Sequence, residues 1–195
     1  MKTKHLFFAM VIVALPFMFF TQSCETVKEE IQEAAAFDVA MDLPDNYFVL
    51  DSVEISKSGA KEEKVLTTQS VEVGLDSILT SYGINSATLS NATFTSVTLT
   101  MDNPVEGANF DFMSGMRVVL SETSDFANET QIASAEEIPA GSTEITFTLD
   151  NENIQSFIDN DSFHLRLYGD LNGALPYATL PLILQSGLQF TVNPI

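Results

Sequence analysis

Alternation of apolar and polar side chains with a period of two recurs along this chain after residue 36, and it limits the fold more than any other feature. Residues 37–43, 97–101, 145–149 and 163–168 all alternate in this way. Successive side chains of a β-strand point to opposite faces of a sheet, so each segment predicts a strand with one buried and one solvated face. The pattern favours an all-β fold.

Turn-forming residues separate these segments, for example at Asn103-Pro104, Pro139-Ala140-Gly141 and Asn172-Gly173. About seven to nine short strands with this punctuation predict an antiparallel β-sandwich of immunoglobulin-like or Greek-key type. A barrel is the alternative. One or two short helices are expected, near 76–82 and 154–158. The last two strands should surround Leu182 and Phe190, the first at a sheet edge because Pro181 cannot donate to a ladder.

The N-terminus has the layout of an export signal. Lys2 and Lys4 precede an unbroken apolar run of 15 residues from Leu6 to Phe20. A membrane-spanning helix needs about 20 such residues, so this run is too short for a permanent span. Small and polar residues follow, at 21–24. The segment therefore predicts a cleaved signal peptide.

The end of this segment, Thr21-Gln22-Ser23-Cys24, resembles the lipobox of bacterial lipoproteins. Ser23 and Cys24 fit that pattern, whereas Thr21 stands where its stricter form has leucine. A plain secretory signal cleaved nearby is the alternative. Cys24 is the only cysteine, so no intramolecular disulfide explains it. The resemblance implies that Cys24 carries a thioether-linked lipid and an acylated amino group.

Three regions follow: a signal peptide at 1–23, a lipidated acidic tether at 24–36 and a β-sandwich domain at 37–195. By resemblance to the sorting signals of Gram-negative lipoproteins, Glu25 is not the aspartate of inner-membrane retention, which implies the outer membrane. The acidic residues of the tether resemble those that send some lipoproteins to the cell surface. Surface and periplasmic orientation both stay open.

The net charge of the mature chain limits the kinds of partner that it can bind. The 8 basic residues include Lys2 and Lys4 of the signal, while all 27 acidic residues follow it, so the mature chain has 6 basic residues and a formal charge of −21. Such a field repels phosphate backbones, which excludes nucleic acid as a partner. The expected partners are the membrane, through the lipid, and an envelope protein or a glycan.

One strand offers candidate ligand-binding side chains. His164, Arg166 and Tyr168 alternate with apolar residues and should form a row on one face, able to bind a carboxylate or a sugar. Tyr168 and Tyr177 flank the turn predicted at 172–173 and are expected at the same end of the fold. The simpler interpretation, which we favour, is a solvated outer face, because the chain has no motif for a nucleophile.

Two weaker sets of candidates concern ions and modification. Asp159 and Asp161 supply oxygen ligands of the kind calcium prefers, but they also suit a helix end and a turn, and we expect no cofactor. Ser52 and Ser77 follow aspartate in a pattern that resembles the O-glycan sites of some bacterial exported proteins.

Residues 97–149 are faintly similar to late-embryogenesis-abundant type 2 sandwich domains. Asn103-Pro104 closes a strand there and residues 138–142 precede another, although Val105 stands where that family tends to place asparagine. The similarity implies a sandwich and transfers no site residue.

The sequence thus predicts a lipid-anchored cell-envelope protein of non-catalytic binding or structural type. The alternative is a glycan-binding accessory module or a surface hydrolase with a carboxylate-lined cleft. A concave pocket with two carboxylates and tyrosine at its rim would favour the alternative, and a uniformly convex polar surface would favour the first.

Overall fold

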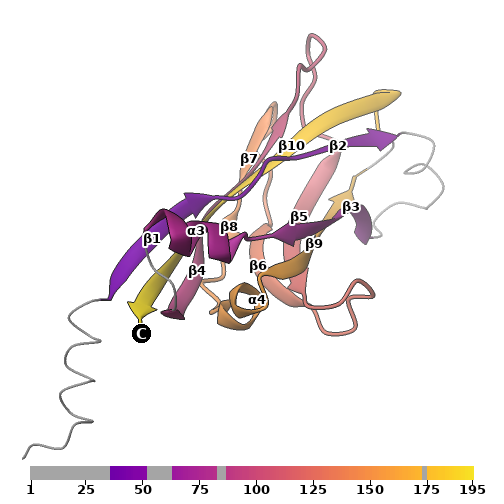
Figure 1. The fold of residues 1–195 in the computed structure, drawn as a ribbon. Coiled ribbons are helices and arrows are strands. Elements are labelled where there is room, and N and C mark those ends of the chain that lie inside the picture. The colour runs from indigo at the N-terminus through magenta and orange to yellow at the C-terminus, as the bar shows by residue number, and fades with distance from the viewer. Residues whose placement is uncertain (1–35, 52–62, 83–86, 173–174) are drawn as a thin grey trace, which may run out of the picture.

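The computed structural model describes residues 36–51, 63–82, 87–172 and 175–195, and in them the chain forms two antiparallel sheets packed together (Figure 1). The predicted β-sandwich is confirmed. Sheet A contains β1 (Phe37–Asp42), β2 (Asn46–Asp51), β4 (Ala87–Met101), β7 (Glu144–Thr146) and β10 (Thr179–Pro194). Sheet B contains β3 (Glu63–Glu72), β5 (Met113–Ser121), β6 (Thr130–Ala135), β8 (Thr148–Leu149) and β9 (Ser162–Leu171).

The core fills the space between the two sheets. It is made by inward-facing residues of the strands together with side chains from both helices and from the connection between β4 and β5, and its largest fully buried side chains are Phe110, Phe163 and Phe190. Two short helices, α3 (Leu75–Ser81) and α4 (Gln155–Asp159), lie close to the predicted positions. No helix among the described residues is long and apolar enough to cross a membrane.

Strand β10 runs unbroken through sheet A, so the prediction of two final strands, the first at an edge, is wrong. On one side β10 pairs with β2 through 179–184 and with β1 through 187–192, and on the other it pairs with β4 (Figure 1). Pro181 is tolerated in this central strand because the ladder to β4 ends beside it, at the pair Leu182 and Met101. Its carbonyl still accepts a hydrogen bond from the Asp102 N–H at 2.9 Å.

The single strand predicted at 145–149 is divided between the two sheets. Strand β7 pairs with β4 in sheet A, whereas β8 pairs with β6 in sheet B. Phe147 lies between them, with its N–H donating to the Val97 carbonyl at 3.0 Å and its side chain in the core. The chain therefore crosses from one sheet to the other at this residue.

Candidate functional site

Strand β9 presents the predicted row on the outer face of sheet B. His164, Arg166 and Tyr168 are half-buried there, and the alternate residues of the strand are buried in the core. The predicted direction of these side chains is confirmed. Side chains from other strands and from a loop pack against this row.

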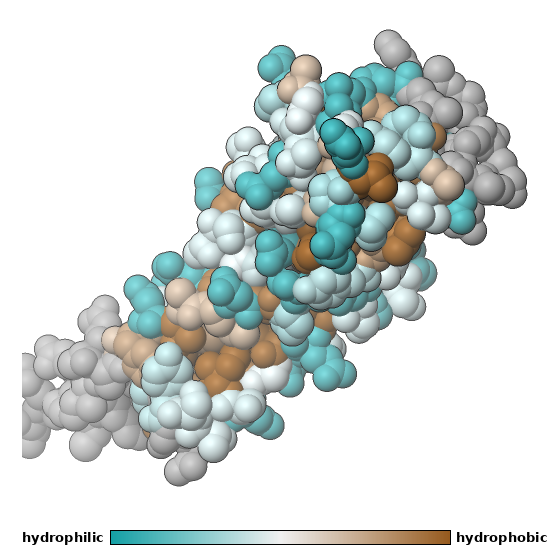
Figure 2. Space-filling model, turned by 90° about the horizontal axis from the view of Figure 1, so that it is seen from above, coloured by the Kyte–Doolittle hydropathy of each residue, from teal (hydrophilic) through white to brown (hydrophobic). Residues whose placement is uncertain are grey.

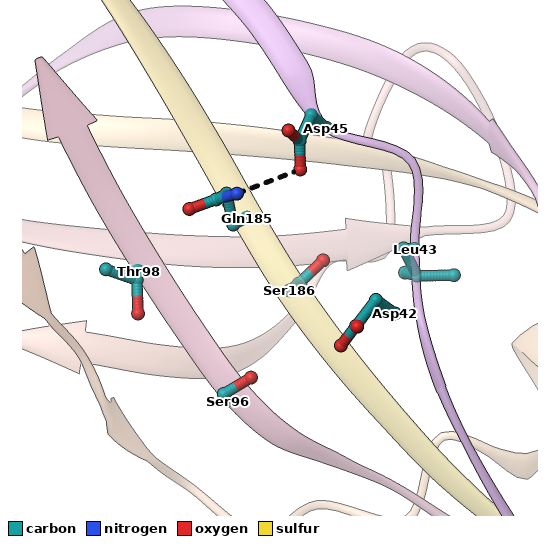
Figure 3. Close-up of a pocket in the computed structure, with 7 residues that line it drawn as sticks. All are labelled: Asp42, Leu43, Asp45, Ser96, Thr98, Gln185 and Ser186. Carbon is teal, nitrogen blue, oxygen red and sulfur yellow. Dashed lines mark hydrogen bonds between the residues drawn. The ribbon is translucent and has the colours of Figure 1, made fainter. Parts of the chain in front are cut away.

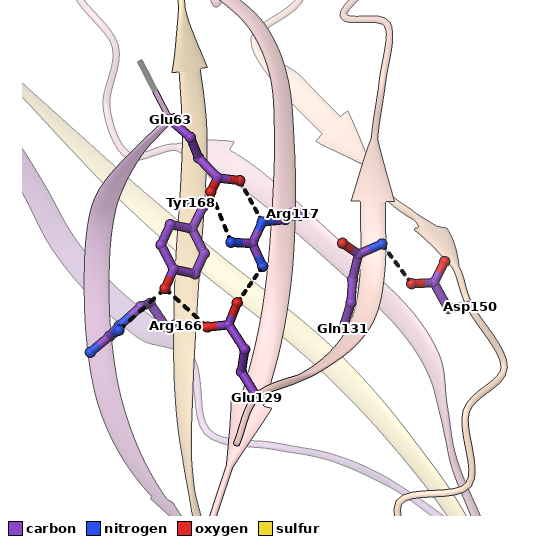
Figure 4. Close-up of polar contacts among 7 residues, drawn as sticks. All are labelled: Glu63, Arg117, Glu129, Gln131, Asp150, Arg166 and Tyr168. Atoms are coloured by element: carbon purple, nitrogen blue, oxygen red, sulfur yellow. Dashed lines mark hydrogen bonds and ion pairs between the residues drawn. The ribbon is translucent and has the colours of Figure 1, made fainter. Parts of the chain in front are cut away.

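Two arginines stack on aromatic rings along this face, and Figure 4 shows the one beside Tyr168. The guanidinium carbon of Arg117, on β5, lies 3.9 Å from the ring centroid of Tyr168. That of Arg166 lies 3.7 Å from the ring centroid of Phe126. Stacking of this kind is attractive because the ring face is electronegative. We call the set Phe126, Arg166, Tyr168 and Arg117 the sheet B column.

Two glutamates neutralise the column. Arg117 binds Glu63 through two nitrogens, one of them 2.8 Å from Oε2, and its third nitrogen lies 2.8 Å from Glu129 Oε1. The Tyr168 hydroxyl donates to Glu129 Oε2 at 3.0 Å and accepts from Arg166 at 3.2 Å. The row thus binds a carboxylate, as its chemistry suggests, but that carboxylate is Glu129 of the same chain.

The loop between β5 and β6 covers the other end of the row. Phe126 is buried outside the main core, between Arg166 and His164, whose ring centroid is 6.3 Å from its own. Its φ of +57° is uncommon for a bulky residue. Asp125 supports this conformation by accepting hydrogen bonds from the Thr123 hydroxyl and the Ala127 N–H. The first of these bonds is the main cause that lowers the pKa of Asp125.

The pKa of Glu129 depends on its contacts with the arginines and the tyrosine of the sheet B column. Burial is the largest single influence on this carboxyl and raises its pKa, but hydrogen bonds from Arg117 and Tyr168, with the arginine charges, outweigh it. The net effect is a pKa below the ordinary value of 4.5. A carboxylate with a lowered pKa stabilises the folded state above its unfolded pKa, and this contribution is lost as the pH falls through the folded value.

Arg117→Ala should therefore destabilise the protein by about 1–2 kcal/mol at pH 7, because it leaves two glutamates without their shared partner. The difference from the wild type should begin to shrink as the pH falls below about 4.5, the ordinary pKa of the carboxyl in the unfolded chain, and should be lost as the pH falls through the lower pKa of Glu129 in the folded protein. Urea denaturation at pH 7 and at pH 3.5 measures both values. Arg166→Ala is the control, since Arg166 stacks on Phe126 rather than pairing with a carboxylate, and its effect should depend less on pH. An equal loss at both pH values for Arg117→Ala would contradict the prediction.

The other predicted site residues lie apart from the column or outside the described residues. Tyr177 is half-buried against the core, and its hydroxyl donates to the Gly107 carbonyl at 3.3 Å. Ser77 is exposed on α3. Cys24 and Ser52 lie outside the described residues.

The two aspartates considered for calcium act locally. Asp161 Oδ1 accepts the Leu75 N–H at 2.7 Å and so caps α3, whose first residue is 86 positions away. Asp159 accepts the side-chain amide of Gln155 at 2.9 Å within α4. Across the described ranges no group of three or more His, Cys, Asp or Glu side chains is placed to hold a metal ion. The expectation of no cofactor, with calcium at Asp159 and Asp161 as the alternative, stays a prediction.

A polar hollow of about 290 Å³ lies on the outer face of sheet A, where the sequence had indicated no site (Figure 3). Three segments supply its walls: the connection from β1 to β2, strand β4 and strand β10. The lining residues are Asp42, Leu43, Asp45, Ser96, Thr98, Gln185 and Ser186.

The hollow arises because β1 and β2 share one side of β10 without meeting. The chain leaves β1 at Asp42, crosses with the Leu43 N–H bonded to the Ser186 carbonyl at 2.9 Å, and starts β2 at Asn46. Gly187 lies at the base of this region, and its N–H donates to Ser96 Oγ at 3.1 Å. A Cβ atom there would lie 2.6 Å from Thr95 Oγ1 and 2.8 Å from Ser96 Oγ, so a larger residue would have to displace both hydroxyls.

Asp45 joins the hollow to an exposed tyrosine. Gln185 Nε2 donates to Asp45 Oδ1 at 3.1 Å, and the Tyr47 hydroxyl donates to Oδ2 at 3.3 Å. The charge of Asp45 is the main cause that raises the pKa of Tyr47. The local sequence shows only a turn at 42–46, because Gln185 is 140 positions from Asp45 and no short motif connects them.

Comparison with protein-family models, with curated proteins and with solved structures finds no match to this chain.

Proposed function

We propose that this chain is a lipid-anchored protein of the outer membrane whose β-sandwich serves in non-catalytic binding. The proposed location rests on the sequence, in which Cys24 follows the short apolar run of residues 6–20 after three small or polar residues. The observation that supports binding is the hollow on sheet A, which places two carboxylates, an amide and hydroxyls beside the exposed ring of Tyr47.

The sheet B column supports a structural role for the predicted His-Arg-Tyr row. Its arginines, its tyrosine hydroxyl and its glutamates bond one another, and Phe126 covers Arg166. A ligand would have to displace these internal partners.

The hollow has the two carboxylates and the rim tyrosine that were expected to favour a glycan-binding module or a surface hydrolase. A glycan-binding module is itself a form of non-catalytic binding, so the surface hydrolase is the second candidate. Paired carboxylates are the usual machinery of glycoside hydrolysis. Asp45 is already held by two hydrogen-bond donors, which suits a fixed binding group. Release of reducing ends from a neutral polysaccharide, abolished in Asp42→Asn, would establish the hydrolase instead.

Covalent lipid at Cys24 is the direct test of the anchor. The full chain, expressed in a Gram-negative host fed an alkyne analogue of palmitate, should become labelled, because the free amino group and the thiol of a mature lipoprotein both carry acyl groups. Mass spectrometry should place the lipid on the N-terminal peptide beginning at residue 24. A mature N-terminus at another residue, or one without lipid, would overturn the anchor.

A further inference from the structure

The outer face of sheet A carries an apolar strip next to the polar hollow. Tyr47 and Val49 of β2 are 64% and 58% exposed. Ile183 and Pro181 of β10 are their direct cross-strand partners, so all four side chains lie on one face. Figure 2 shows hydrophobic patches among hydrophilic side chains on the surface seen from above.

Some of the polar side chains in the hollow beside this strip stay available to bind a ligand. Tyr47 is tethered at the rim by Asp45, which also holds Gln185. Of the other residues lining the hollow, Asp42, Thr98 and Ser186 form no side-chain hydrogen bond with another described residue, although Figure 3 shows Asp42 and Ser186 side by side at the hollow. These groups offer both donors and acceptors to a ligand.

The negative charge on the outer face of sheet A disfavours the binding of anions. Asp42 and Asp45 line the hollow, and Asp102 is near enough to contribute to the raised pKa of Tyr47. The basic side chains of the described residues, Lys64, Arg117 and Arg166, all belong to strands of sheet B. A phosphate, sulfate or carboxylate group would therefore be repelled from the hollow.

We propose that the hollow binds a neutral saccharide, with a C–H face of the sugar packed on Tyr47 and its hydroxyls bonded to Asp42, Gln185 and Thr98. A neutral sugar supplies many hydroxyls and an apolar ring face, which are the two surfaces that meet here. The hollow of about 290 Å³ is close to the lower end of small-ligand pockets, at about 300 Å³. This assignment rests on the proposed binding function and names its ligand class.

Affinity electrophoresis of the full lipidated chain tests the proposal, in a detergent without a sugar headgroup. The gels contain galactomannan, dextran, xyloglucan or mannan, or else polygalacturonate or chondroitin sulfate as acidic polymers. At least one neutral polymer should retard the protein, and the acidic ones should not. Tyr47→Ala and Gln185→Ala should each weaken retardation at least tenfold.

Tyr82→Ala is the matched control, because Tyr82 is also exposed, at 55%, but stacks on Phe37 away from the hollow. It should leave retardation unchanged. Tyr47→Phe keeps the ring and the fold while removing the bond to Asp45, and should weaken retardation less than Tyr47→Ala.

Three results would overturn the proposal: no retardation by any neutral polymer, equal retardation by the acidic polymers, or an equal loss in Tyr82→Ala and Tyr47→Ala. A lipidated Cys24 together with any of these results would leave the anchor intact and reject only the saccharide. Binding of a protein partner at Tyr47 in place of a sugar would likewise reject the saccharide but retain the binding function.

Discussion

Truncation of Phe147 to alanine should lower the free energy of unfolding by about 3–5 kcal/mol, the usual cost of removing a large buried aromatic side chain. Phe147 is only 4% exposed and packs in the core where the chain passes between the sheets. Its loss leaves a cavity that both sheets border, so neither sheet can close it alone. Guanidinium denaturation followed by circular dichroism measures the change.

Val105→Ala is the control for this measurement, since Val105 is 63% exposed and its truncation should change stability by less than about 0.5 kcal/mol. If Phe147→Ala yields too little folded protein, Phe147→Leu should still unfold at a clearly lower denaturant concentration than the wild type. A near-neutral result for either Phe147 variant would place this side chain outside the core.

Cys24→Ala should move the protein from the membrane fraction to the soluble fraction. One acyl chain holds a protein only marginally and two or more hold it stably, so removing their attachment point removes the anchor. Fractionation of cells expressing the full chain, with a carbonate wash of the membranes, measures the shift.

Ser23→Ala is the matched control for the anchor, because alanine is also small and suits the position before the modified cysteine. It should leave the protein in the membrane fraction. Membrane association that persists in Cys24→Ala would show that another segment holds the protein.

The period of two in the sequence correctly predicted strands that have one apolar and one polar face, such as β1 and β9. It did not predict strand boundaries where both faces of a strand are apolar, or where the chain passes from one sheet to the other. In β10, Pro181 and Ile183 are apolar on the outer face and hide the alternation. Gly187 looks like a turn but marks a register shift within a continuous strand. Only the packing of Thr95 and Ser96 against it reveals the reason for glycine.

Strand β6 was missed for a related reason. Ile132 and Ala133 are adjacent and both buried, next to a register shift between Val118 and Val119 of the neighbouring strand. The irregular pairing breaks the period of two. The division of 145–149 was equally hidden, because alternation is the same on both sides of the crossing and only long-range pairing assigns each half to its sheet.

The candidate sites could likewise be predicted only where their residues lie on one strand. The row of His164, Arg166 and Tyr168 followed from the strand period, since all three lie on one strand. Its partner Glu129, and Arg117 with its own partner Glu63, lie on or beside other segments, and no local pattern connects them to the row. The hollow on sheet A combines three separate segments in the same way.

Strand β1 begins where the predicted tether ends and finishes at the hollow. It runs for six residues from Phe37 to Asp42, a length of about 20 Å. With the anchor proposed at Cys24, a pull on an occupant of the hollow would reach the bilayer through β1 and the predicted tether. Because β1 lies antiparallel along β10 from 187 to 192, a force along β1 would load its backbone hydrogen bonds together in shear rather than break them one at a time.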